Sequence, residues 1–201
     1  LARVRRLADR LGALEVSDHL SFTAAGGVHH HDLLPLPWTE ESLRHVAGRV
    51  ARIQDALGRR LLVENVSAYL AFRHSTLTEP ELLSALVAAT GCGLLVDVNN
   101  LYVNQANHGV DARAWLAAMP PEAVGEAHLA GHEARDGVLV DTHGAPVSPD
   151  VWALYRHFAA RFPGVPVLLE RDNDIPPLGD LLAEARRAQA ILDDPEADRA
   201  A

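Results

Sequence analysis

The sequence predicts an α/β protein built around parallel strands. Five short apolar segments alternate with helical segments along a chain of 201 residues. Such alternation is typical of parallel strands that are joined by right-handed crossover helices. The five segments are apolar almost throughout, as expected for strands covered on both faces, and each ends in polar side chains.

The helices are indicated by apolar residues at helical spacing and by suitable end residues. Thr39 is a favourable N-cap and Gly58 a favourable stop. Between them, Leu43, Val46 and Val50 repeat along one face. In chain order the expected elements are helix 1–14, strand 14–22, helix 39–58, strand 60–70, helix 78–91, strand 92–104, helix 110–120, strand 123–132, helix 148–162, strand 164–172 and helix 177–193.

Three segments fall outside this alternation. Residues 23–32 are rich in small and polar side chains and predict a loop. Residues 137–147 predict a short extended segment within a long loop on the catalytic side of the strands. Residues 194–201 form a polar tail. We therefore expect a single domain over residues 1–193, followed by this tail.

Composition excludes several functional classes. Eighteen Lys and Arg against 27 Asp and Glu give a net charge of −9, and without a basic stripe a nucleic-acid partner is not expected. The single cysteine, Cys92, excludes a disulfide framework and thiolate-held zinc or iron–sulfur sites. No apolar run approaches the roughly 18–20 residues of a membrane span, and no secretory signal opens the chain. We expect a cytoplasmic protein with no membrane partner.

Carboxylates and imidazoles gather where the predicted strands end. In parallel α/β folds these carboxyl ends build the functional site, and buried carboxylates are rare unless they are paired or bind metal. The inward-facing candidates are three imidazoles and four carboxylates: His19, Glu64, Asp97, His128, Asp141, His143 and Glu170. This set exceeds the four ligands of tetrahedral zinc. It fits two or three ions of the iron or manganese kind.

Other polar residues near the strand ends are candidates for contacting substrate or supporting the ligands. They are Asn65, Asn99, Asn100, His108 and His132. For His108, a role in stabilising its turn is at least as good an interpretation as contact with substrate. The histidine tract at residues 29–31 is expected to be solvated, and Cys92, at the amino end of its strand, is expected to be structural.

Several strings in this order resemble the DUF692 family, also called UPF0276, over about residues 1–190. The characterised members of that family are multinuclear non-heme iron-dependent oxidative enzymes, among them the iron subunit of methanobactin synthase. The strings that carry the resemblance are SDHLSF, HDLLPLPWTEESL, LGRRLLVENVSAYL, TGCGLLVDVNNLYVN with NHG, EAHLAGH, VDTHGAPV and VPVLLERD.

The resemblance implies a TIM barrel of the xylose-isomerase-like type with two or three irons at its C-terminal face. The seven candidates named above match the ligand positions of the family motifs. A complete barrel has eight strands and typically about 250 residues, whereas this chain offers five strands and begins with Leu1. We therefore expect about three N-terminal strands of the barrel to be absent from the sequence.

The resemblance also implies an activity. Members of the DUF692 family use dioxygen to oxidise ribosomally synthesised precursor peptides, usually at cysteine. They commonly work with a separate protein that recognises the leader peptide. Two alternatives stay open on the residues alone. One is a metal-dependent sugar isomerase or phosphodiesterase-like hydrolase on the same barrel, and the other is a non-catalytic metal-binding scaffold.

Overall fold

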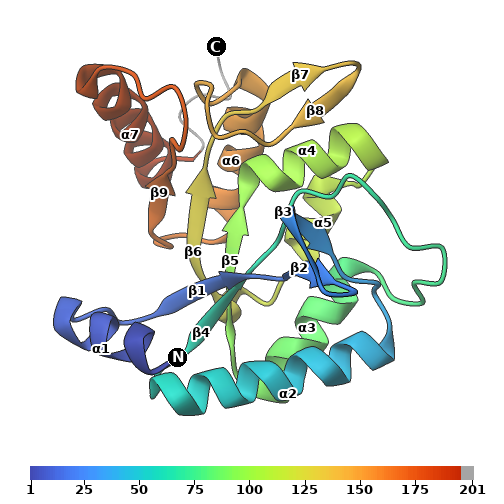
Figure 1. The fold of residues 1–201 in the computed structure, drawn as a ribbon. Helices are drawn as coiled ribbons and strands as arrows, with labels where there is room; N and C mark the ends of the chain where they lie inside the picture. Colours follow the sequence, from blue (N-terminus) through green and yellow to red (C-terminus); the bar gives the residue numbers. More distant parts are fainter. Residues whose placement is uncertain (196–201) are drawn as a thin grey trace. The chain divides into compact units, whose positions relative to one another are not determined.

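The computed structural model describes residues 1–195, in which the five strands of the main sheet are separated by helices and two short hairpins are inserted (Figure 1). The chain divides into two compact units, of which the first holds residues 1–66 and 70–95. Its elements are α1 (Ala2–Leu11), β1 (Val16–His19), β2 (Ser21–Ala25), β3 (Val28–Pro35), α2 (Glu40–Leu57), β4 (Leu61–Glu64), α3 (Glu79–Thr90) and the start of β5 (Gly93–Asp97).

Of the described residues, the second unit holds 67–69 and 96–195. After the end of β5, its elements are α4 (Val98–His108), α5 (Ala112–Ala118), a 3-10 turn (Pro121–Ala123), β6 (Val124–Leu129), β7 (Glu133–Arg135), β8 (Val138–Val140), α6 (Pro149–Arg161), β9 (Val167–Leu169) and α7 (Leu178–Asp193).

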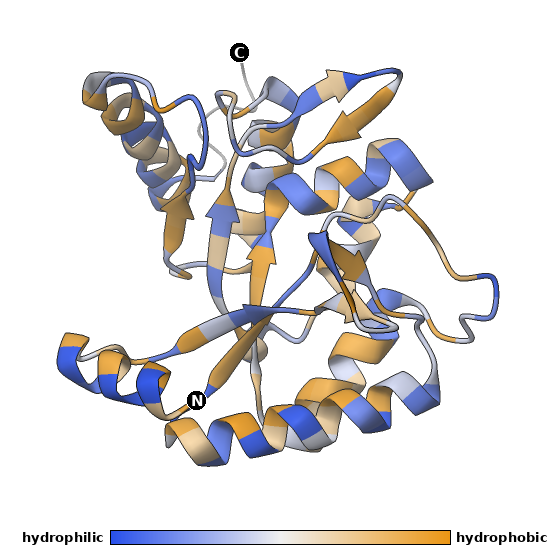
Figure 2. Ribbon diagram, in the orientation of Figure 1, coloured by the Kyte–Doolittle hydropathy of each residue, from blue (hydrophilic) through white to orange (hydrophobic). Residues whose placement is uncertain are grey.

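The main sheet is parallel, as the sequence predicts. Its strands follow the order β1-β4-β5-β6-β9, and the parallel pairs β1–β4, β4–β5 and β6–β9 have a defined register. The apolar strands form the core: Leu62, Leu94 and Val96 are each at most 1% exposed. Figure 2 shows β4 and β5 as mainly hydrophobic. The register of β1 and β4 pairs His19 with Glu64 at the carboxyl ends of both strands.

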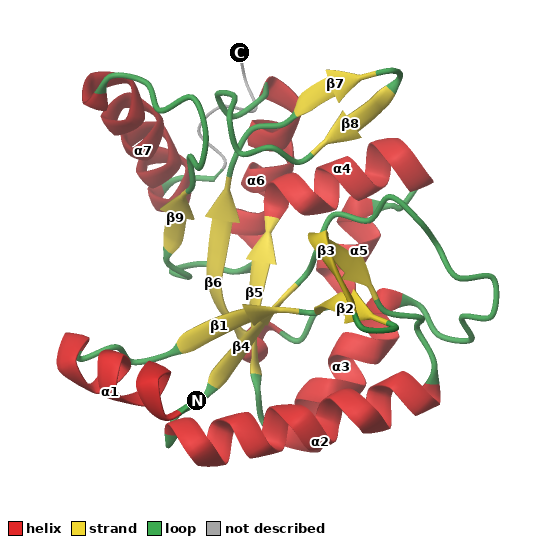
Figure 3. Cartoon of the chain, in the orientation of Figure 1, coloured by secondary structure: helices red, strands yellow, loops and turns green. Residues whose placement is uncertain are grey.

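The predicted loop at residues 23–32 is wrong, because this segment forms an antiparallel hairpin of β2 and β3 (Figure 3). Gly26 and Gly27 make its turn with φ of 57° and 78°. Two successive left-handed residues suit a hairpin turn, and Gly-Gly is a favoured sequence for it. The histidine tract lies on β3 and is exposed, so only its expected solvation is correct.

The predicted strand at residues 92–104 is also wrong in its second half. β5 ends at Asp97, and α4 begins at the next residue. The cause is local, because the carboxylate of Asp97 accepts a hydrogen bond from the backbone N–H of Asn100 at 2.7 Å. This is an N-cap. Asn99 and Asn100 therefore lie in the first turn of a helix rather than on a strand.

The segment at residues 137–147 is extended only at its start. β8 pairs with β7 in a short antiparallel hairpin, and Asp141 and His143 follow β8. His143 has a φ of 48°, which an extended segment would not show. Among residues 1–195, no helix is long and apolar enough to cross a bilayer. Most of the predicted tail, residues 196–201, lies outside the described part of the chain.

Candidate metal centre

Asp97 lies at the junction of β5 and α4 and is completely buried. One carboxylate oxygen, Oδ1, caps α4 through Asn100. The other, Oδ2, lies 3.6 Å from Nε2 of His143. β5 positions Asp97, and the start of α4 holds its carboxylate. The side chain is therefore fixed by local structure before any ligand binds.

His143 follows β8 in a loop that hydrogen bonds attach to the end of β9. The carbonyl of His143 accepts a hydrogen bond from the backbone N–H of Asp172 at 2.9 Å. The side-chain amide of Asn173 donates to the carbonyl of Thr142 at 2.9 Å, and Arg171 donates to the carbonyl of Gly144 at 3.3 Å. Residues after β9 therefore set the position of the His143 imidazole.

Four carboxylates surround the ring of His143. Its Nε2 lies 2.8 Å from Asp141 and 3.6 Å from Asp97, and its Nδ1 lies 3.2 Å from Glu170 and 3.4 Å from Asp172. Both ring nitrogens are buried, and within residues 1–195 neither has a hydrogen bond of good geometry. Several carboxylates around a buried imidazole without good hydrogen bonds indicate a cation site, since a cation would neutralise the clustered negative charge.

Glu170 follows β9 directly, and its backbone N–H donates to the carbonyl of Leu129 at 2.8 Å. One oxygen, Oε2, lies 3.2 Å from Nδ1 of both His128 and His143. The imidazoles of His128 and then His143 lower the pKa of Glu170 well below its usual range, against the opposing effect of burial. Glu170 is therefore an anion at neutral pH.

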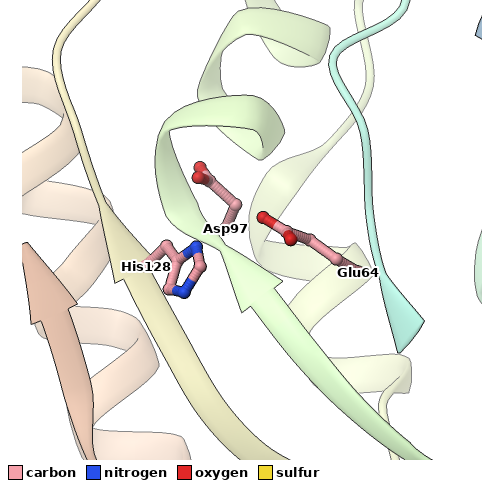
Figure 4. A group of neighbouring side chains, drawn as sticks. All are labelled: Glu64, Asp97 and His128. Carbon is pink, nitrogen blue, oxygen red and sulfur yellow. The ribbon is translucent and has the colours of Figure 1, made fainter. Parts of the chain in front are cut away.

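Within residues 1–195, two groups of side chains could hold a metal ion. Asp97, His143 and Glu170 form one group, whose ligand atoms lie within 4.8 Å of one another. Glu64, Asp97 and His128, drawn in Figure 4, satisfy the same limit. Asp97 belongs to both groups. All ligand atoms are carboxylate oxygens and imidazole nitrogens, a donor set that suits divalent iron, manganese or zinc.

Without a metal, the cluster makes His143 strongly basic. Burial by itself lowers the pKa of His143, but the carboxylates of Asp141, Glu170 and Asp97 outweigh it and raise the pKa to about 11. The ring is therefore protonated at neutral pH. A metal must displace this proton in order to bind the imidazole.

We accordingly expect metal binding at His143 to release a proton and to strengthen as the pH rises. Below the raised pKa, the apparent affinity should increase about tenfold per pH unit, because one proton is displaced per metal bound. Calorimetric titration of the metal-free protein with Zn²⁺ in buffers of different ionisation enthalpy measures the protons released. An affinity that does not change between pH 6.5 and 8.5 would contradict this assignment.

The sequence matches a known family along almost its whole length. A family model described as RiPP precursor modification enzyme MbnB/TglH/ChrH matches residues 1–193. The chain belongs to this family. A UPF0276 protein of Acaryochloris marina is 48% identical over 192 residues, and one of Chromobacterium violaceum is 52% identical over 192 residues. Each match covers 96% of this chain and 70% of the relative, and the family resemblance seen in the sequence is thereby confirmed.

Solved structures support the predicted fold class. An L-ribulose 3-epimerase matches with a TM-score of 0.56 and 17% identity, over 96% of this chain and 65% of its own. The 3-keto-D-glucoside 4-epimerase of E. coli matches with a TM-score of 0.52 and 14% identity, over 96% of this chain and 68% of its own. At these identities the similarity concerns the fold alone. The predicted likeness to xylose-isomerase-like TIM barrels is confirmed, and the chain spans under two thirds of the first of these structures.

The structure brings most of the predicted ligand candidates of this MbnB/TglH/ChrH family member into contact with one another. Asp97, His128, Asp141, His143 and Glu170 are connected through the short distances given above. In the first unit, Nε2 of His19 lies 3.4 Å from Oε2 of Glu64. Glu64 is buried, whereas the side chain of His19 is 41% exposed. The ligand roles of all seven residues stay predictions.

The residues expected to support the ligands have different roles in the structure. Asn99 donates from Nδ2 to Oδ1 of Asp141 at 2.8 Å. Its own Oδ1 lies 2.8 Å from Nδ1 of His132, whose ring packs beside Tyr102 at 5.2 Å between centroids. Asn65 is buried. His108 lies 2.6 Å from the carbonyl of Ala68 rather than from any candidate ligand.

Sequence reasoning missed three residues of the centre. Asp172 approaches His143, Glu126 lies 4.0 Å from Nε2 of His128, and Ser67 donates to Oδ2 of Asp141 at 3.2 Å. Glu126 and Asp172 could have been found, since each lies two residues from a candidate ligand at a strand end. Ser67 could not, because it meets Asp141 from 74 residues away in the sequence.

Proposed function

We propose that this protein is a multinuclear iron-dependent oxidase that uses dioxygen to modify a ribosomally synthesised precursor peptide at cysteine. We also propose that a separate protein recognises the leader of that peptide. Membership of a family described as RiPP precursor modification enzymes supports a peptide substrate. The observation that carries the metal centre is the buried ring of His143 among four carboxylates.

The ions would be held by the three imidazoles and four carboxylates found at the strand ends: His19, Glu64, Asp97, His128, Asp141, His143 and Glu170. Bound iron would supply one-electron redox chemistry with dioxygen. The protein contributes no thiol of its own, because Cys92 is buried and burial raises the pKa of its thiol. Sulfur chemistry at this centre would therefore take place on the substrate.

The alternatives are less well supported. The similarity to sugar epimerases concerns the fold alone, so it does not favour a sugar isomerase or a hydrolase over peptide modification. A non-catalytic scaffold would bind metal but would not consume oxygen. A sugar isomerase or hydrolase would hold zinc or manganese and would stay active without oxygen. The identity of the metal, oxygen consumption and activity without oxygen together therefore separate the three functions.

The proposal is tested on protein purified without oxygen and reconstituted with ⁵⁷Fe²⁺. We expect more than one iron per chain, Mössbauer signals of coupled iron ions, and oxygen consumption when a cysteine-containing precursor peptide is added with its recognition protein. Less than one iron per chain would contradict a multinuclear centre. Full iron loading without oxygen consumption would leave a scaffold as the better interpretation.

We expect His128→Ala to lose iron while the fold is retained, because the imidazole lies 3.2 Å from Glu170 and belongs to one of the two metal-binding groups. His45→Ala is the matched control, since His45 is exposed on α2, where it accepts a hydrogen bond from Arg49 at 2.9 Å. Iron per chain and circular dichroism are measured for both. Equal iron content in the two variants would refute the role of His128.

A further inference from the structure

Asp141 receives hydrogen bonds from two distant parts of the chain. Asn99 donates to its Oδ1, as described above, and Ser67 donates to its Oδ2 at 3.2 Å. Its backbone N–H donates to the phenol oxygen of Tyr69 at 2.9 Å. Ser67 and Tyr69 flank Ala68, so one three-residue segment holds both the side chain and the main chain of Asp141.

That segment is itself held by the C-terminal half of α4. The backbone N–H of Ala68 donates to Oδ1 of Asn104 at 2.7 Å. The carbonyl of Ala68 lies 2.6 Å from Nε2 of His108. A carbonyl can only accept, so Nε2 of His108 carries the proton in this contact. Asn104 and His108 thus provide hydrogen-bond partners for both the backbone N–H and the carbonyl of Ala68, as a neighbouring strand in a sheet would.

α4 also holds the hairpin strand from which Asp141 extends. The side-chain amide of Asn107 donates to the carbonyl of Leu139 at 2.8 Å and accepts from its N–H at 3.0 Å. Asn104, Asn107 and His108 are three and four residues apart, so they lie on one side of the helix. Their contacts reach the two segments that meet at Asp141.

We propose that Asn104 and His108 are positioning residues for the metal centre. By fixing Ala68, they place Ser67 and Tyr69, and these two residues set the orientation of Asp141 beside His143. This assignment gives His108 no direct contact with substrate. It rests on the proposed function in one respect, namely that Asp141 takes part in holding a metal.

The test compares His108→Ala with His108→Gln in the full chain. His108 is exposed, so both variants should fold, and the Gln amide restores a donor for the Ala68 carbonyl. We expect His108→Ala to weaken Fe²⁺ binding about tenfold, in line with the loss of other groups that orient metal ligands. His108→Gln should recover most of this loss, and Asn104→Ala should resemble His108→Ala.

A second measurement does not need metal. In the metal-free protein, loss of the Ala68 contact should speed hydrogen–deuterium exchange of the Asp141 amide about 5- to 10-fold, since one hydrogen bond contributes about 1 kcal/mol. Unchanged exchange together with unchanged Fe²⁺ affinity would overturn the proposal, and a higher KM for peptide would then assign His108 to substrate binding. Failure of the unmodified protein to bind Fe²⁺ would contradict the proposed function, whereas the exchange result would still decide the positioning role.

Discussion

The Asp97→Asn variant is expected to lose metal binding while its fold is retained. Asp97 is the residue shared by the two groups that could hold a metal ion, and it is completely buried. Asn is as good an N-cap as Asp, so the contact to the Asn100 N–H survives and α4 still begins at Val98. The substitution removes the negative charge, and we expect Fe²⁺ affinity to fall on the order of 100-fold or more.

Asp111→Asn is the matched control for this experiment. Asp111 caps α5 by accepting hydrogen bonds from Arg113 and Ala114, and it is exposed. The same chemical change is therefore made at a helix start away from the candidate ligands. Fe²⁺ affinity and thermal unfolding are measured for both variants. Metal binding by Asp97→Asn that equals that of the control would refute a shared ligand.

The Glu184→Ala variant is expected to lose a largely buried ion pair and to unfold more easily. Oε2 of Glu184 lies 3.0 Å from Arg171, whose side chain is only 6% exposed. Oε1 accepts from the backbone N–H of Val147 at 2.8 Å. Removing the carboxylate leaves a buried guanidinium without its anion, which typically costs about 3–5 kcal/mol. For a chain of this size, that corresponds to a Tm lower by roughly 10 °C.

Glu133→Ala provides the comparison. Glu133 pairs with Arg135 at 2.7 Å, but their side chains are 38% and 60% exposed. Surface pairs of this kind contribute at most about 1 kcal/mol, so the Tm of this variant should change little. Glu184→Gln keeps an acceptor for the Val147 N–H. Its Tm should therefore fall between those of Glu184→Ala and Glu133→Ala. Equal Tm values for Glu184→Ala and Glu133→Ala would show that the Arg171 pair does not stabilise the fold.

Elements with a strong local signal could be predicted from the sequence. The parallel strands are short apolar runs, and α2 and α3 begin directly after their N-cap residues, Thr39 and Thr78. The hairpin of β2 and β3 was not predicted, because its strands are too polar to show a clear alternation and only Gly26-Gly27 marks the turn. The start of α4 was not predicted either, since a β-propensity run continues past Asp97 and a single side-chain contact ends the strand.

By itself, the sequence determined the fold class, the family and the chemical type of the site, because strand periodicity and residue type decide which acids and imidazoles reach the carboxyl ends of parallel strands. Only the tertiary structure decided how these groups are held. It places four carboxylates around His143, and it brings Ser67 into contact with Asp141, which lies 74 residues away in the sequence. It also assigns His108 to the Ala68 carbonyl. Such contacts depend on loops meeting in space, and no local pattern encodes them.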